Sequence, residues 1–329
     1  MAQQEVSSQQ PHPGDQHEIP SIEAHGSFES LKDRIKTHYE IASDYYYSLW
    51  GQHIHHGLFK SPSETKEQAQ VNLINFLLEI SALPAGSKVL DVGCGIGGTS
   101  RFLAREHGCQ VTGITISGRQ VEIARQVTAT ETSDSASSSP GDFAKYPGEA
   151  GKTEGQVRFL ELDAEKMLEH FRPATSEAET FDCVWISEAL SHLPNKELFF
   201  SSSFSLVKSG GLLVIADWFK APGLSPEQEA ADIKPIEDGM LLPRLYTADE
   251  YVALATQAGF KTRKEPVDIS KDVAKTWDIS WSLVSSPSLW AFAISQGRDG
   301  LAFLQAFRTM RRGYANGTFR YAVMCFEKP

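Results

Sequence analysis

The stretch Lys88-Val89-Leu90-Asp91-Val92-Gly93-Cys94-Gly95-Ile96-Gly97-Gly98-Thr99 indicates the fold of this 329-residue chain. It opens with a short apolar run, passes through closely spaced glycines and enters the helix-like segment 100–105. A strand, a glycine-rich turn and a helix in this order bring backbone N–H groups and a helix N-terminus close to a nucleotide. Glycine is needed because any Cβ would hold the ligand away from the backbone. The stretch therefore predicts a nucleotide-like ligand at the end of a strand.

The glycines alone leave the identity of that ligand open. Gly93, Gly95 and Gly98 also satisfy the dinucleotide pattern G-x-G-x-x-G, and a lone match of this kind is weak. Asp91 stands at the end of the strand, where a carboxylate can hold an ammonium group, and the stretch lacks the lysine of a phosphate-binding P-loop. These details favour S-adenosylmethionine over a dinucleotide such as NAD or a purely structural turn.

The composition narrows the class of partner. Lys and Arg number 31 and Asp and Glu number 42, so the formal charge is -11, which disfavours nucleic acid and anionic membranes as partners. No apolar run approaches the ~20 residues of a membrane span, and the first thirty residues lack a signal-peptide pattern. The four cysteines show no C-x-x-C spacing and indicate reduced thiols. We expect a cytoplasmic monomer or homodimer that acts on a small molecule.

The domain organisation follows from changes in composition. Residues 1–27 are rich in Gln, Ser, Pro and His and are expected to be a disordered tail ahead of a single domain, 28–329. The domain begins with a helical cap, 28–82, whose second helix is expected to start at an N-cap Ser63. Residues 130–156 are polar and low in complexity, which predicts a flexible surface insertion.

Strand and helix patterns alternate through the rest of the domain. After the opening strand, further strands are predicted at 110–116, 157–162, 181–187, 211–216 and 319–326. Helices are predicted at 119–129 and 247–258, and 302–314 is amphipathic, whereas 222–244 reads as a polar segment without clear pattern. Repeated strand–helix units predict an α/β fold with a mostly parallel sheet and helices on both faces.

Four polar groups follow strand ends and should converge, because ligands of such sheets bind at the carboxyl ends of the strands. They are 91–95, 115–120, Asp163 and 187–192. The second strand ends without the carboxylate that usually takes ribose hydroxyls, and the amide of Gln120, helped by the Thr115 hydroxyl, is a candidate replacement. The alternative is a solvated Gln120 behind an N-cap Ser117.

Two of these strand ends allow both a functional and a structural interpretation. Asp163 is placed to accept a hydrogen bond from an adenine amino group, and it is also a plain helix N-cap. His192 is a candidate general base because its unperturbed pKa lies near neutrality, or it only shapes the pocket.

A segment rich in aromatic residues and histidine, 45–59, lies in the cap. His53, His55 and His56 suggest metal ligation, but no carboxylate or cysteine partner stands at ligand spacing. A lid packed over the donor and ordinary core packing are the other two interpretations. Tryptophans after the fifth strand, Trp218 among them, are more often core residues, although their density fits the wall of an apolar acceptor pocket.

These residues together resemble a known family. Residues 89–98, Val-Leu-Asp-Val-Gly-Cys-Gly-Ile-Gly-Gly, look like motif I of class I S-adenosylmethionine-dependent methyltransferases. Residues 113–120 resemble the G-I-T-x-S-x-x-Q variant of the branch with tocopherol, sterol and cyclopropane-fatty-acid methyltransferases. Residues 50–57 are similar to the W-G-x-H-x-H-H-G segment of γ-tocopherol methyltransferase-like enzymes, and His192-Leu193-Pro194 to their H-M-P. Ser191 departs from the glutamate usual in that position.

The resemblance implies a Rossmann-like fold with a seven-stranded sheet, an N-terminal helical cap and a C-terminal substrate-covering region at 219–318. It also implies a donor site for S-adenosylmethionine without a metal, with S-adenosylhomocysteine as the product. The candidate donor-binding residues are Tyr39, Ser43, Asp91, Gly93, Cys94, Gly95, Thr115, Ile116, Gln120, Asp163, Ala164 and Ser187. The candidate catalytic residues are His192 and His56, and the candidate acceptor-binding residues are Trp50, His53, His55, Trp218 and Met240.

The leading functional hypothesis is a methyltransferase that acts on N, S or C of a small, largely apolar metabolite of secondary metabolism. A C-methyltransferase of a prenylated quinol or lipid-like acceptor is the alternative within the same class. An NAD-dependent oxidoreductase and a non-catalytic donor-binding protein are the alternatives from other classes. The oxidoreductase predicts an acid after the second strand, where the sequence has none.

Overall fold

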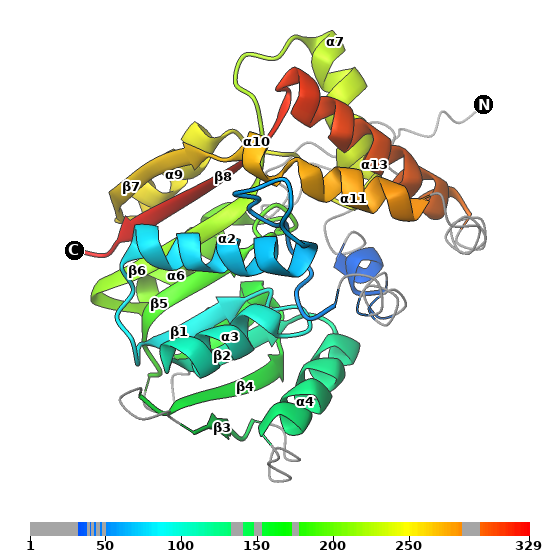
Figure 1. Ribbon diagram of the computed structural model, residues 1–329. Helices are drawn as coiled ribbons and strands as arrows, with labels where there is room; N and C mark the ends of the chain where they lie inside the picture. The colour runs from blue at the N-terminus through cyan, green and yellow to red at the C-terminus, as the bar shows by residue number, and fades with distance from the viewer. Residues whose placement is uncertain are drawn as a thin grey trace, which may run out of the picture.

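The protein is built around one eight-stranded sheet with the strand order β3-β4-β2-β1-β5-β6-β8-β7 (Figure 1). The computed structural model describes residues 32–37, 40, 43, 47, 51–132, 141–147, 153–172, 178–284 and 297–329. The candidate donor residue Tyr39 and the candidate acceptor residue Trp50 lie outside these ranges, as does the predicted tail 1–27.

The strands have the bounds β1 Lys88–Val92, β2 Gln110–Thr115, β3 Ala144–Tyr146, β4 Gly155–Glu161, β5 Phe181–Ser187, β6 Val207–Lys220, β7 Lys261–Asp268 and β8 Phe319–Glu327. The five strands β4, β2, β1, β5 and β6 pair in parallel, and β3, β8 and β7 pair antiparallel to their neighbours. The mostly parallel sheet is thereby confirmed. It has one strand more than the seven expected, because β3 forms within the expected insertion 130–156 and pairs with the edge of β4.

The helices alternate with the parallel strands and cover both faces of the sheet, as predicted. Their bounds are α2 Lys66–Ser81, α3 Gly98–His107, α4 Gly118–Thr132, η2 Ala164–Lys166, α5 Met167–Phe171, α6 Lys196–Leu206, α7 Pro226–Gln228, η3 Glu229–Ile233, α8 Lys234–Gly239, α9 Ala248–Ala258, α10 Ser270–Val273, α11 Lys275–Val284 and α13 Arg298–Asn316. Residues 32–37, 40, 43 and 47 are also helical and belong to the cap.

The cap helix α2 begins two residues later than predicted. Thr65 is its N-cap and forms a reciprocal capping box with Gln68, whereas Ser63 bonds through its hydroxyl to Ser61. Glu64 does not start the helix because its carboxylate accepts the backbone N–H groups of Lys60 and Ser61. The T-x-x-Q box therefore competes successfully with the earlier serine for the helix start.

The segment 222–244, expected to be a polar stretch without pattern, is instead largely helical and forms α7, η3 and α8. Its start is fixed by a capping box between Ser225 and Gln228, with Pro226 at the first helical position. Helix α8 then packs closely against α13 at Gly239, where an added Cβ would lie 2.2 Å from the carbonyl oxygen of Ala302. Together with α11, these helices stand above the carboxyl ends of the strands (Figure 1).

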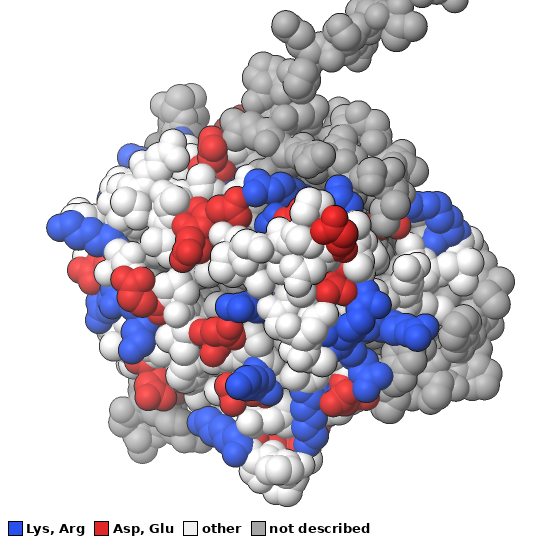
Figure 2. All heavy atoms as spheres, turned by 90° about the horizontal axis from the view of Figure 1, so that it is seen from above, with Lys and Arg blue, Asp and Glu red and all other residues white. Residues whose placement is uncertain are grey.

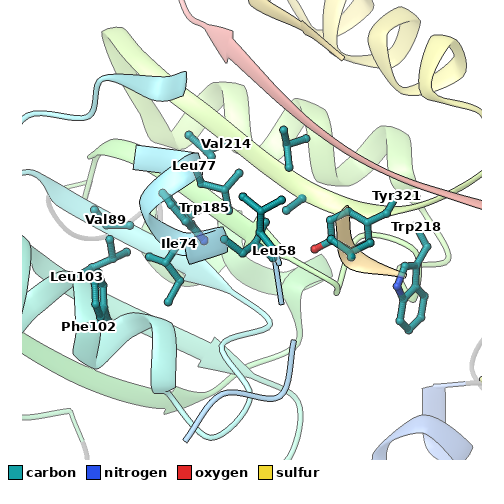
Figure 3. Close-up of a cluster of buried hydrophobic side chains, with 14 of the residues drawn as sticks. Leu58, Ile74, Leu77, Val89, Phe102, Leu103, Trp185, Val214, Trp218 and Tyr321 are labelled. Atoms are coloured by element: carbon teal, nitrogen blue, oxygen red, sulfur yellow. The ribbon is translucent and has the colours of Figure 1, made fainter. Parts of the chain in front are cut away.

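Two apolar clusters hold the layers together. Helices α2, α3 and α4 pack on one face of the sheet through a cluster that includes Leu77, Phe102 and Val121, and this cluster extends to Trp218 and Tyr321 (Figure 3). Helices α5, α6 and α9 cover the other face, with Phe171 and Tyr251 in the second cluster. Strands buried on both faces are typical of a doubly wound sheet.

The surface carries charges of both signs, which are interspersed on the face shown in Figure 2. Within the described ranges, no helix is both long enough and apolar enough to cross a membrane.

Candidate active site

Strand β1 carries a buried carboxylate near its carboxyl end. Asp91 is 3% exposed, and its Oδ2 accepts the hydroxyl proton of Ser100 at 2.5 Å. Burial raises the pKa of Asp91 to about 6, and the Ser100 hydrogen bond only partly opposes that shift. A cationic group placed beside Asp91 would lower that pKa again and favour the ionised form.

The glycine turn after β1 is shaped by steric exclusion. Gly93 has φ +74, and an added Cβ would lie 2.3 Å from the Cβ of Ala189. The amides of Gly93 and Cys94 both donate to the carbonyl of Ile114 at 2.9 Å, which ties the turn to β2. Gly95 has φ +54, and its missing Cβ faces open space. The turn therefore presents backbone to a cavity, as the glycine pattern predicted.

The ends of β2 and β4 add polar groups to the same place. The Thr115 hydroxyl donates to Oε1 of Gln120 at 2.6 Å, and both residues are buried. Asp163 caps η2 by accepting the amide of Glu165 at 3.0 Å, while its other oxygen lies 3.2 Å from Nζ of Lys32. The two interpretations of Asp163 are compatible, because the capping residue also faces the cavity.

A first cavity lies where these strand ends converge. Its lining contains ten of the twelve candidate donor residues: Asp91, Gly93, Cys94, Gly95, Thr115, Ile116, Gln120, Asp163, Ala164 and Ser187. Ser43 is buried but is not among the lining residues, and Tyr39 lies outside the described ranges. Lys32 and Ile35 of the cap close one side of this cavity.

A second cavity adjoins the first and is lined mainly by apolar side chains of the region after β5. The two cavities share Ile35, Ile54, His55, Glu188 and His192. The candidate acceptor residues Trp218 and Met240 line the second cavity, together with Trp277, Phe303 and Phe307. The candidate acceptor residue His53 lines the first cavity and is absent from the lining of the second.

His56 and Glu188 form a buried pair at the boundary between the cavities. Nδ1 of His56 lies 2.9 Å from Oε2 of Glu188, and the backbone N–H of His56 donates to Oε1 at 2.7 Å. The Tyr321 hydroxyl donates to the same Oε1 at 2.9 Å. Burial alone would raise the pKa of Glu188, but the charge and hydrogen bonds of His56 outweigh it and lower that pKa. Glu188 is therefore held as a carboxylate.

No function was predicted for Glu188, although it lies inside the segment 187–192 that was predicted to reach the site. It directly follows β5 and has φ +55, a left-handed conformation that is uncommon for a residue with a side chain. The sequence carries one signal for a functional role of Glu188, because a charged residue occupies the first position after a buried parallel strand. Its partners His56 and Tyr321 lie 132 and 133 residues away in the chain, so no local pattern joins them.

The histidine segment packs as a buried part of both cavities. Burial lowers the pKa of His53 to about 2, and the positive charges of neighbouring groups add to that shift. The rings of His53 and His55 lie 5.2 Å apart, and His56 makes ring contacts with Trp218, Trp277, Tyr314 and Tyr321. In the described part of the chain, no three His, Cys, Asp or Glu side chains are grouped to hold a metal ion.

His192 lines both cavities from a loop that is fixed by buried charges. Asp217 accepts the amide of Ser191 at 3.0 Å, and Nζ of Lys196 donates to the carbonyl of Leu193 at 2.9 Å. Burial lowers the pKa of Lys196 to about 7, and it raises the pKa of Asp217 to about 6. The ring of His192 lies 6.0 Å from that of Trp218, at the side of the second cavity.

The fold and the two joined cavities define a class I methyltransferase architecture. A model of the methyltransferase domain family matches residues 64–265, so the chain belongs to that family. The protein is an enzyme, a methyltransferase that uses S-adenosylmethionine as its methyl donor.

Two curated relatives show the range of similarity. The chain is 27% identical to tocopherol O-methyltransferase, chloroplastic, of Arabidopsis thaliana over 327 residues, which covers 92% of this chain and 84% of that protein. It is 32% identical to 2-methyl-6-phytyl-1,4-hydroquinone methyltransferase of Synechocystis over 253 residues, covering 75% and 67%. These relatives confirm the predicted branch.

Solved structures of low sequence identity share the fold. A mycolic acid cyclopropane synthase, solved as a complex with SAH and CTAB, has a TM-score of 0.71 at 18% identity and covers 93% of this chain and 99% of that one. A geranyl diphosphate C-methyltransferase from Streptomyces coelicolor has a TM-score of 0.64 at 15% identity, covering 93% and 100%.

Proposed function

We propose that the protein methylates an extended, largely apolar small molecule that carries one polar reacting group, and that this molecule occupies the second cavity. The observation that carries the proposal is the way the two cavities meet. Their shared wall contains the polar residues His55, Glu188 and His192, whereas Trp218, Met240 and other apolar side chains line the second cavity beyond it. An apolar pocket with a few polar groups at one end suits a lipid-like acceptor.

The first cavity is the proposed donor site. S-adenosylmethionine supplies a methyl group on a sulfonium, which is transferred by in-line displacement. Asp91 would hold the ammonium group of the donor, Thr115 and Gln120 its ribose hydroxyls, and Asp163 its adenine amino group. Cys94, Ile116, Ala164 and Ser187 line the same cavity and exclude water from it.

His56 is the proposed proton acceptor for the reacting group. Glu188 lies within hydrogen-bond distance of Nδ1, which places the proton there and leaves Nε2, 3.4 Å from the Tyr314 hydroxyl, as the basic nitrogen. A hydroxyl or amine that gains the methyl group would lose its proton to Nε2 of His56. His192 stands on the wall that the two cavities share, where it either takes this proton itself or shapes the pocket.

A prenylated hydroquinone is the second candidate acceptor, with methylation on carbon. The names of the two curated relatives, a tocopherol O-methyltransferase and a 2-methyl-6-phytyl-1,4-hydroquinone methyltransferase, support the choice of a prenylated phenol or quinol ring. The aromatic and apolar lining of the second cavity also suits a flat ring with a long isoprenoid tail. The general proposal, an N, S or C acceptor of secondary metabolism, is compatible with the same lining.

Three further properties belong to this proposal. We infer a monomer or homodimer in the cytoplasm that is not stably inserted into membranes. The formal charge of -11 disfavours nucleic acid as a partner. We infer a reaction without a metal ion, because a sulfonium methyl group needs no Lewis acid for its transfer. The residues 219–318 are proposed to cover the acceptor, since α8, α11 and α13 contribute Gly239, Trp277 and Phe307 to the second cavity.

The test is a search for labelled products with S-adenosylmethionine that carries an isotopically labelled methyl group. Purified protein is incubated with fractionated apolar metabolites and, separately, with 2-methyl-6-phytyl-1,4-hydroquinone. We expect label in an apolar product and a loss of that label in His56→Asn. Binding of S-adenosylhomocysteine without label in any fraction would instead indicate a non-catalytic donor-binding protein. Tight NADH binding without S-adenosylhomocysteine binding would overturn the donor assignment.

A further inference from the structure

The imidazole of His55 is held in one tautomer by the backbone. Its Nδ1 lies 2.8 Å from the carbonyl oxygen of His56, inside the protein. A carbonyl oxygen only accepts hydrogen bonds, so Nδ1 carries the hydrogen and Nε2 presents a lone pair. The segment itself is fixed by Gln70, whose side-chain amide donates to the carbonyls of His53 at 2.7 Å and His55 at 3.1 Å.

Nε2 of His55 is a buried acceptor without a partner among the described residues. The side chain is 8% exposed and lines both cavities, at the wall that they share. Burial lowers the pKa of His55, which keeps the ring neutral and the lone pair in place. A buried polar atom left without a hydrogen bond is destabilising, so a ligand that supplies a donor to it binds more tightly.

Trp218 provides the complementary group on the second cavity. Its indole N–H is buried and has no acceptor within the described ranges, and the residue is 5% exposed. Trp218 lines only the second of the two cavities, whereas His55 lines both. Among the described residues that line the acceptor cavity, the buried groups without a hydrogen bond thus include the acceptor Nε2 of His55 and the indole N–H donors of Trp218 and Trp277, which complement a hydroxylated ligand.

We propose that His55 positions the methyl acceptor by accepting a hydrogen bond from its hydroxyl or N–H group at Nε2, and that Trp218 donates to an oxygen of the same molecule. This inference rests on the proposed function and adds the polar groups that the apolar acceptor must carry. His55 is a positioning residue in this scheme, because it holds a hydroxyl or N–H other than the reacting group, whose proton goes to His56. Molecules of the right shape without a free donor, such as ethers, are then poor ligands.

The test measures binding and does not depend on turnover. Calorimetry on the full chain, saturated with S-adenosylhomocysteine, compares para-nonylphenol with para-nonylanisole, which keeps the oxygen and loses the donor. The variants are His55→Leu, which removes both ring nitrogens, and His55→Gln, which restores an acceptor oxygen near the position of Nε2. Both variants lose the hydrogen bond to the carbonyl of His56. The difference between their phenol preferences therefore reports only the hydrogen-bond acceptor atom near the position of Nε2.

We expect the unmodified protein to bind the phenol about tenfold more tightly than the ether, which is the effect of one hydrogen bond to a buried group. His55→Leu should abolish this preference and His55→Gln should keep most of it. Trp218→Phe should weaken the phenol and the ether by the same factor, because both retain the oxygen.

Three results would overturn the proposal. The first is equal binding of phenol and ether by the unmodified protein, as expected if Nε2 meets only a bound water. The second is an undiminished phenol preference in His55→Leu. The third is a tenfold loss of S-adenosylhomocysteine affinity in His55→Leu with the preference intact, which would assign Nε2 to the methyl donor. A phenol preference that depends on His55, without any labelled product in the methyl-transfer assay, would leave this inference standing and contradict the proposed function.

Discussion

The donor cavity and the acceptor cavity share a wall but are built in different ways. The donor cavity is made largely by strand ends and by backbone, and at Gly95 an added side chain would extend into open space. The acceptor cavity is lined in large part by residues of segments far apart in the chain, with Met240 directly after α8, Trp277 in α11, Phe307 in α13 and Trp218 in β6. We infer that the sheet fixes the shape of the donor cavity. The ligand specificity of the acceptor cavity can instead change when its lining side chains are substituted.

The largest expected effect is on the backbone-built donor cavity. Gly95→Ala places a methyl group into the open space that Gly95 faces, and donor affinity should fall about 100-fold or more because the ligand is overpacked. Calorimetry with S-adenosylhomocysteine measures the change. The control is Gly223→Ala, since Gly223 also has a positive φ, +68, with open space at its Cβ position, and it lines neither cavity. Equal losses in both variants would mean that strain alone, and no cavity contact, explains the effect.

The wall between the cavities should affect the rate more than donor binding. Glu188→Gln removes the charge beside His56 and should lower kcat about 100-fold, within the range of general-base effects, with a much smaller effect on donor affinity although Glu188 also lines the donor cavity. Tyr321→Phe removes a single hydrogen bond to the same carboxylate and should lower kcat only about threefold. A parallel loss of donor affinity in Glu188→Gln would show that Glu188 supports the fold of the site and has no separate role in the rate.

The buried carboxylate of the donor cavity should make donor binding depend on pH. The pKa of Asp91 is raised to about 6, so the ionised form that pairs with an ammonium group accumulates as pH rises toward 6. Affinity for S-adenosylhomocysteine should increase over that range and level off above it. The ligand-free fold should lose stability over the same interval, because a carboxyl with a raised pKa binds its proton more tightly when folded.

Asp91→Asn is the matched variant for this pH dependence. It should weaken S-adenosylhomocysteine about 30-fold above pH 7, as expected for the loss of a charge-assisted hydrogen bond, and should flatten the rise between pH 4 and pH 6. Asp217, whose pKa is also about 6, remains in this variant and serves as an internal reference. An unchanged pH profile would assign the dependence to Asp217 or to another group.

The acceptor cavity should tolerate substitutions that the donor cavity does not. Met240→Trp narrows the second cavity and should raise KM for an apolar acceptor about tenfold, while Met240→Ala should widen it and favour bulkier acceptors. Affinity for S-adenosylhomocysteine should stay within about twofold in both variants, because Met240 does not line the first cavity. A comparable loss of donor affinity would contradict the separation of the two cavities.

The smallest effect is expected where the cap closes the donor cavity. Lys32 lies 3.2 Å from Asp163 and 2.7 Å from Glu165, and its side chain is 25% exposed. Lys32→Met should weaken S-adenosylhomocysteine about threefold, and high salt should reduce the difference from the unmodified protein, because such pairs are screened. Lys36→Met removes a 2.7 Å pair to Glu161 outside the cavity and should have no effect on donor affinity. Equal effects of both variants would favour a general role of the cap in stability.

Much of the fold could be predicted from the sequence, because the patterns that indicate its strands, turns and helices lie in neighbouring residues. The strand at Lys88–Val92, the glycine turn and the helix at Ala248–Ala258 were predicted from neighbouring residues, and β5 was predicted with its observed bounds. The helices of 222–244 were missed although Ser225-Pro226-Glu227-Gln228 carries a capping box, because the apolar spacing behind it is irregular. Strand β3 was missed because three residues at a sheet edge give no periodicity.

The sequence by itself determined the donor half of this protein. A turn that must pass close to a ligand requires glycine. The carboxyl ends of the strands of one parallel sheet lie on the same side of the sheet, so the sequence alone predicted that Asp91, Gln120 and Asp163 lie close together. Only the tertiary structure decided the acceptor half. The contacts of Glu188 with His56 and Tyr321 join residues 132 and 133 positions apart, and the tautomer of His55 depends on a backbone carbonyl whose place the fold sets. Such contacts arise from the packing of cap, sheet and helices, and no short-range pattern encodes them.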